Sequence, residues 1–149
     1  MFSVNLFSQG ENSSYNVDAN YFYGNILPHN NTIRHLITEH PDGILISFNK
    51  KTFGNKEWES TYNFPDYGAS FHYENTKNET LGDLYGLYGH YNFYFLNRNL
   101  MFRVGQGISY NTSPYDKNTN FRNLAYGSNW MPSTYFMLNY KKENLDILM

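Results

Sequence analysis

Serine, histidine and a carboxylate alternate along one short stretch of the chain. Ser70, His72 and Glu74 are each two residues apart, so in an extended strand their side chains share one face, about 7 Å apart along the backbone. These residue types are the ingredients of nucleophilic catalysis. Polar residues at this spacing are equally what the wet interior of a β-barrel requires, and no oxyanion hole is indicated nearby. We therefore interpret them as interior-facing residues and predict no catalytic residue here.

Three histidines lie in one polar segment that could in principle gather metal ligands. His29, His35 and His40 are five or six residues apart and lie beside Glu39 and Asp42. The zinc patterns H-x-x-x-H and H-E-x-x-H are missing from this segment. We interpret it as a polar loop, and the sequence predicts neither a metal nor a cofactor.

A second segment begins like a calcium-binding loop. Asp116, Asn118 and Asn120 place oxygen atoms at the first, third and fifth positions. An EF-hand loop then needs Gly at position six and Glu at position twelve, but Phe121 and Gly127 stand there. Without the sharp turn and the bidentate carboxylate, the segment is predicted to be an ordinary loop.

The elements that must position these residues are strands, because apolar and polar residues alternate with a period of two. Between Ser14 and Tyr23, for example, the odd positions are mostly apolar or aromatic and the even ones mostly polar, which gives a strand one apolar and one polar face. A three-residue connection, 97–99, predicts a tight hairpin. The six predicted strands cover Ser14–Tyr23, Ile44–Phe53, Asp66–Asn75, Leu84–Leu96, Leu100–Asn111 and Ser128–Lys142.

Strand length and composition favour a membrane barrel. The predicted strands are longer than the 5–6 residues usual in soluble sheets, and a tilted membrane strand needs about 9–11. Aromatic residues make up 19% of the chain, charged residues 16%, and cysteine is absent, which excludes disulfides and thiolate metal sites. A net charge of -2 gives no basic surface for nucleic acid. No apolar run is long enough for a transmembrane helix.

We therefore predict an all-β fold: an antiparallel up-and-down barrel of the outer-membrane type, incomplete, with about six of eight strands. Residues 1–12 are predicted to be a signal-like or frayed N-terminus outside the fold, and residues 13–149 a partial barrel domain. Arg103 is predicted to face the interior with a carboxylate partner, because a charge facing lipid at mid-depth costs about 2–4 kcal/mol. Aromatic girdles are predicted from Tyr85, Tyr88, Tyr91, Tyr94, Trp58 and Trp130.

A series of short motifs, in order along nearly the whole chain from about Ser14 to Asn144, resembles the Bacteroidetes-type branch of the lipid A 3-O-deacylase family. The motifs are Tyr23-Gly24-Asn25-Ile26-Leu27, His35-Leu36-Ile37-Thr38 with His40-Pro41, Lys51-Thr52-Phe53-Gly54 with Glu57-Trp58, Tyr62-Asn63 with Pro65-Asp66, Tyr85-Gly86-Leu87-Tyr88, His90 to Leu96, Asn99-Leu100, Arg103 with Gly105 and Gly107, Asn120 to Asn123, Ala125 to Ser128, and Leu138 to Lys141.

The resemblance implies an eight-stranded barrel in the outer membrane of a Gram-negative bacterium that hydrolyses an ester-linked acyl chain of lipid A. The partners that the resemblance implies are lipopolysaccharide and outer-membrane lipid, and the resemblance leaves the oligomeric state open. It also implies a Ser nucleophile and a His base carried as His-x-Ser on a late strand, with a Glu orienting the His. None of the five histidines begins such a motif. No catalytic residue is therefore carried over, and we expect this chain to lack the catalytic segment and to be inactive alone.

Two other functions remain open at this stage. A non-enzymatic outer-membrane barrel, serving as a structural protein, adhesin or pore, would have the same strands. A soluble lipid-binding barrel of the lipocalin type is disfavoured, because the predicted strands carry aromatic residues on alternating faces.

Overall fold

The computed structural model describes residues 2–6, 14–26, 31–37 and 39–140. Its elements are β1 (Phe2–Leu6), β2 (Tyr15–Tyr23), the 3-10 helix η1 (Asn31–Leu36), β3 (Asp42–Lys50), α1 (Glu57–Thr61), β4 (Asp66–Asn75), β5 (Leu84–Phe95), β6 (Leu100–Asn111) and β7 (Trp130–Tyr140). The strands form one antiparallel sheet in the order β1 to β7, each paired with its neighbours in sequence. The all-β, up-and-down fold is confirmed. Among the described residues, no helix is long and apolar enough to cross a membrane.

One strand lies where none was predicted. β1 pairs with β2 over five residues, from Phe2↔Tyr21 to Leu6↔Val17. It falls within residues 1–12, which the sequence had not assigned to the fold, so the strand count of six was too low by one. Its five residues, FSVNL, do alternate between apolar and polar, but the stretch is short and was interpreted as part of a signal-like terminus.

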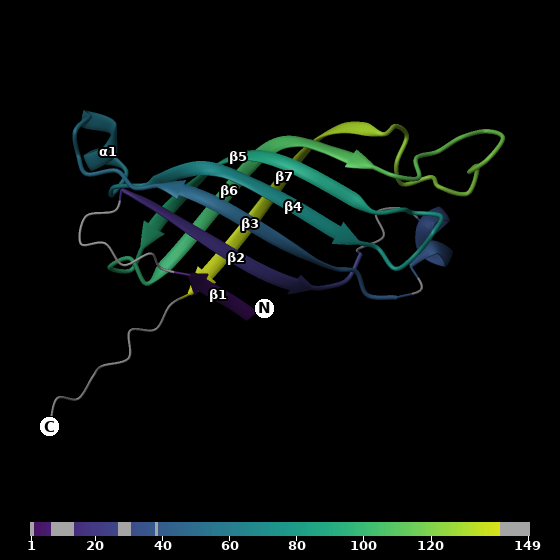
Figure 1. The fold of residues 1–149 in the computed structure, drawn as a ribbon, viewed down its shortest axis with the longest axis horizontal. Coiled ribbons are helices and arrows are strands. Elements are labelled where there is room, and N and C mark those ends of the chain that lie inside the picture. The colour runs from purple at the N-terminus through teal and green to yellow at the C-terminus, as the bar shows by residue number, and fades with distance from the viewer. Residues whose placement is uncertain (1, 7–13, 27–30, 38, 141–149) are drawn as a thin grey trace, which may run out of the picture.

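The sheet curls strongly about its long axis (Figure 1). Asp18 of β2 contacts Arg103 of β6 at 2.7 Å, although three strands lie between β2 and β6. Neighbouring strands are about 4.8 Å apart, so in a flat sheet β2 and β6 would be separated by about 19 Å. The contact therefore requires the curvature of a barrel. Among the described residues β1 and β7 form the two edges of the sheet, so the barrel is not closed.

The connections sort only in part by length at the two ends of the sheet, because 51–65 is longer than 76–83. At one end lie the connections 24–41, 76–83 and 112–129, and we call this the long-loop end. At the other lie 51–65, which carries α1, and the short turn 96–99; we call this the short-turn end (Figure 1). The short turn is tight because Leu96, Asn97 and Arg98 all adopt positive φ, and the amide of Asn99 donates to the carbonyl of Leu96.

Candidate functional site

The interior of the curled sheet is polar and is organised around one arginine. Arg103 is 1% exposed. Its guanidinium donates to both carboxylate oxygens of Asp18, at 3.2 and 2.7 Å, and to Ser47 at 2.5 Å. It also donates to Asn92 at 2.6 Å and to Asn49 at 3.1 Å. The predicted interior position of Arg103 and its predicted carboxylate partner are both confirmed.

A serine and a histidine meet in the same interior, but they are not the pair that the sequence suggested. Ser70 of β4 lies 2.5 Å from Nδ1 of His90 on β5, and Nε2 of His90 lies 2.7 Å from Oδ1 of Asn49. That amide oxygen also receives donors from Asn92 and Arg103. An amide oxygen cannot donate, so Nε2 must carry the ring proton, and in the neutral ring Nδ1 then accepts from the serine hydroxyl. The sequence missed His90 because only the pairing of β4 with β5 brings it near Ser70.

The alternating triplet shares one face as expected but does not form a catalytic chain. His72 Nε2 lies 3.7 Å from Glu74, whereas Ser70 bonds to His90 and to the Tyr135 hydroxyl at 2.6 Å. The His72 ring stacks on Phe22 at 5.1 Å. These contacts support our interpretation of the triplet as interior-facing polar residues.

Burial decides what the Ser70–His90 pair can do. The two residues are 1% and 2% exposed. A serine nucleophile must be reached by its substrate and by water, and this one is covered by Tyr135, which bonds to it from β7. The pair is therefore part of a hydrogen-bonded network that joins β2 to β7 across the interior. Satisfied networks of this kind fix one arrangement of a polar core.

The outward face of the sheet is apolar. Phe48, Phe71, Leu87 and Phe136 are all more than two-fifths exposed, and they lie within β3, β4, β5 and β7, between the two ends of the face. The polar outward pair at this level, Gln106 and Thr134, satisfy each other through a side-chain hydrogen bond of 2.5 Å.

Aromatic side chains gather at both ends of this outward face. We define the short-turn belt as Tyr15, Lys50, Tyr67 and Tyr91, and the long-loop belt as Tyr21, Tyr73, Tyr85, Tyr110 and Trp130. Within the belts, rings contact across strands at 6.1 Å for Tyr67–Tyr91 and 5.0 Å for both Tyr73–Tyr85 and Tyr110–Trp130.

The predicted girdle residues divide between the two faces. Tyr85, Tyr91 and Trp130 are exposed on the outward face. Tyr88 and Tyr94 instead point into the interior, where Tyr88 bonds to Ser133 and Tyr94 to Asp66, so their assignment to a girdle was wrong. The reason is parity: in β5 Tyr85 and Tyr91 are odd-numbered, whereas Tyr88 and Tyr94 are even-numbered and share the face of His90. Trp58 lies outside the sheet, on α1.

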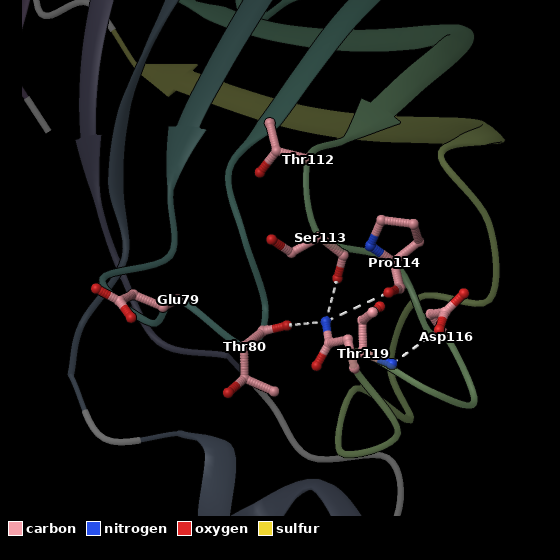
Figure 2. A pocket seen from close by; sticks show the side chains of 8 residues that line it. Glu79, Thr80, Thr112, Ser113, Pro114, Asp116 and Thr119 are labelled. Atoms are coloured by element: carbon pink, nitrogen blue, oxygen red, sulfur yellow. Dashed lines mark hydrogen bonds between the residues drawn. The ribbon is translucent and has the colours of Figure 1, made fainter.

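At the long-loop end, the connections 76–83 and 112–129 border an open hollow (Figure 2). The Asn120 amide ties them together by donating to the carbonyls of Thr80 and Ser113. Asp116 accepts from the backbone amides of Asn118 and Thr119, each at 2.8 Å, and these bonds lower the pKa of its carboxyl. The carboxylate thus closes its own turn, as expected of an ordinary loop.

The predicted polar loop is only partly within the described residues. His29 lies outside them, His35 is exposed, and the His40 ring lies 5.2 Å from that of Tyr23. Across the described ranges there is no group of three histidine or carboxylate side chains that could hold a metal ion.

Comparison with known proteins gives one match. Residues 42–148 match the family described as lipid A 3-O-deacylase (PagL). Neither the curated proteins nor the solved structures contain a significant match to the chain. The matched range begins at β3 and includes every later strand.

Proposed function

Because the chain belongs to the lipid A 3-O-deacylase (PagL) family, we propose that it is an outer-membrane protein of the deacylase type. Its substrate class is lipid A, in which the family's reaction is hydrolysis of an ester-linked acyl chain. The observation that carries the membrane placement is the outward face, with two aromatic belts and an apolar zone between them.

The layout of that face, with aromatic residues at both borders of an apolar zone, supports placement in a bilayer. Tyr15 and Tyr21 are six residues apart on β2, or about 20 Å along the strand at the usual rise. The apolar band of outer-membrane barrels is about 25 Å tall and is bordered by aromatic residues at both interfaces. In hydrocarbon, polar groups must be satisfied within the protein, and the Gln106–Thr134 pair meets that condition.

The filled interior supports a scaffold rather than a pore. Arg103, Asn49, Asn92, Ser47 and Ser70 are all less than 2% exposed, and their hydrogen bonds cross the space that a channel would occupy. If the protein is instead a non-enzymatic barrel, a structural or adhesive role is favoured over a pore.

We further propose that these 149 residues do not hydrolyse lipid A by themselves. The sequence contains no His-x-Ser, and the Ser70–His90 pair is sealed from substrate. The chain would supply the barrel wall against which the lipid lies.

The test uses the chain refolded into detergent and then into vesicles. Incubation with lipopolysaccharide, followed by mass spectrometry of lipid A and of released fatty acid, is expected to show no acyl loss, with the Ser70→Ala variant as a matched control. Acyl release by the unaltered chain would overturn the proposed inactivity, and its loss in Ser70→Ala would identify the buried pair as the cause.

The deacylase assignment itself is tested with DNA. The gene is read on both sides of the codons for these residues: a His-x-Ser in an aromatic strand of the same protein, with acyl release from lipid A by a chain that includes it, would support the assignment. If no such motif is encoded, or if a chain that includes it releases nothing, the deacylase assignment fails and a structural or adhesive barrel is favoured.

A further inference from the structure

One lysine stands on the outward face between two tyrosine rings. Lys50 ends β3 and has the parity of Ile44, Ile46 and Phe48, so it points away from the interior. Its ammonium nitrogen lies 5.8 Å from the ring centroid of Tyr15 and 6.0 Å from that of Tyr67. The two rings hold the lysine at the level of the short-turn belt.

The ammonium of Lys50 forms no ion pair with any carboxylate among the described residues. The opposite belt differs in this respect. There Lys77 lies 3.0 Å from Asp42, and the hydroxyl of Tyr21 donates to the same carboxylate at 3.0 Å. The charge of Lys77 is thus neutralised within the protein, whereas Lys50 retains an unneutralised charge.

Arg98, another cation at the short-turn end, is engaged within the protein. Arg98 stacks over Tyr94 at 3.8 Å and donates to the carbonyls of Asn63 and Phe64. Nη2 of Arg98 also lies 3.9 Å from Oδ1 of Asp66. Lys50 is therefore an exposed, unneutralised charge in the short-turn belt, positioned directly above the apolar zone.

A ligand for this position must carry a negative charge and also tolerate an apolar surface beside it. Below Lys50 on the outward face, Phe48 stacks against Tyr15 at 5.5 Å, and Phe48 and Ile46 are exposed. A lipid places its charged headgroup at the interface and its acyl chains along such a surface. Lysine side chains near strand ends extend their charged group toward the interface in this way.

We propose that Lys50, held between Tyr15 and Tyr67, binds the phosphate of an anionic phospholipid headgroup. One ammonium matches the single net negative charge of a headgroup such as phosphatidylglycerol, which zwitterionic phosphatidylcholine lacks, and basic groups near a membrane surface attract anionic lipids. The inference rests on the membrane placement proposed above. It adds a lipid site on the outward wall that is separate from any ester hydrolysis.

The experiment measures lipid binding to the chain folded in detergent. Native mass spectrometry counts adducts as phosphatidylglycerol or phosphatidylcholine is titrated. The unaltered chain is expected to prefer phosphatidylglycerol. Lys50→Gln is expected to weaken phosphatidylglycerol binding about fivefold, the effect of one basic group near a charged surface, and to leave phosphatidylcholine binding unchanged.

Two control variants accompany it. Lys50→Arg keeps the charge and is expected to bind as the unaltered chain does. Lys117→Gln removes an exposed lysine from the 112–129 connection at the other end and is expected to change nothing. Equal phosphatidylglycerol binding by Lys50→Gln and the unaltered chain would overturn the site, as would a loss of the same size in Lys117→Gln.

Membrane insertion is scored separately, by circular dichroism and by flotation with vesicles. A chain that inserts but shows no preference for phosphatidylglycerol refutes the lipid site and leaves the proposed function standing. A folded chain that fails to insert in any lipid refutes both.

Discussion

Arg103 offers the sharpest test of how the curled sheet is held together. Its guanidinium donates five hydrogen bonds, two of them to the Asp18 carboxylate. Arg103→Met keeps the aliphatic stem but removes every donor. Asp18 then keeps only its bonds from Asn20 and Asn49, and its charge is left without a counter-charge.

Removing one partner of a buried ion pair costs about 3–5 kcal/mol. With a urea dependence of about 2 kcal/mol per molar, this lowers the unfolding midpoint by roughly 2 M. The fluorescence of Trp58 and Trp130 reports unfolding of the chain in detergent micelles. The unfolding midpoint of Arg103→Lys is expected to lie between those of Arg103→Met and the unaltered chain, because lysine keeps the charge but lacks the planar guanidinium.

A double-mutant cycle isolates the pair from the rest of the network. Asp18→Asn in the Arg103→Met background removes the uncompensated carboxylate, so the double variant is expected to be more stable than the sum of the single changes predicts, by up to about 3 kcal/mol. If Arg103→Met does not fold, Asp18→Asn alone still tests the pair through its lower midpoint. Additive effects, or an unchanged midpoint in Arg103→Met, would refute the conclusion that this contact stabilises the curled sheet.

Three further outcomes follow from the same structure. Gly105→Ala would place a Cβ 2.1 Å from the Tyr135 ring, so we expect a loss of about 1–3 kcal/mol in the same urea assay; an unchanged midpoint would contradict the close packing of that ring. Acidification should loosen the 112–129 connection. Hydrogen bonds from backbone amides lower the pKa of Asp116 in the folded chain. The stabilisation by the ionised carboxylate is therefore present above the pKa of the unfolded chain and is lost as the pH falls through the pKa of the folded chain. Hydrogen exchange at Thr119 should therefore rise below about pH 4, and Asp116→Asn should abolish that pH dependence. Ser70→Ala should leave lipid binding unchanged but lower the free energy of unfolding by about 1 kcal/mol, the net value of a typical hydrogen bond; a loss of lipid binding would show that Ser70 does more than support the interior.

Much of the fold was predictable because it depends on local alternation. The period of two assigned the inward and outward residues of β2 to β7, and it placed Arg103 inside because lipid excludes a charge. The failures within this set were local as well. Tyr88 and Tyr94 were misassigned although their parity already placed them on the inward face. β1 was missed although its five residues alternate, because so short a stretch was interpreted as part of a signal-like terminus.

The interior network was beyond the sequence for a different reason. The alternation of apolar and polar residues predicts which face of the sheet a side chain occupies, but not which residue of another strand lies beside it. The Ser70–His90 contact depends on the register of β4 with β5, and the Asp18–Arg103 contact on the curl that brings β2 and β6 together.

The sequence by itself therefore determined the strands, their polar and apolar faces and the resemblance to a deacylase family. Only the tertiary structure decided that Ser70 bonds to His90 rather than to His72, and that Ser70 and His90 are both buried. The physical reason is that side-chain direction is a property of each strand, whereas register and curvature arise from the packing and hydrogen bonding of all the strands together.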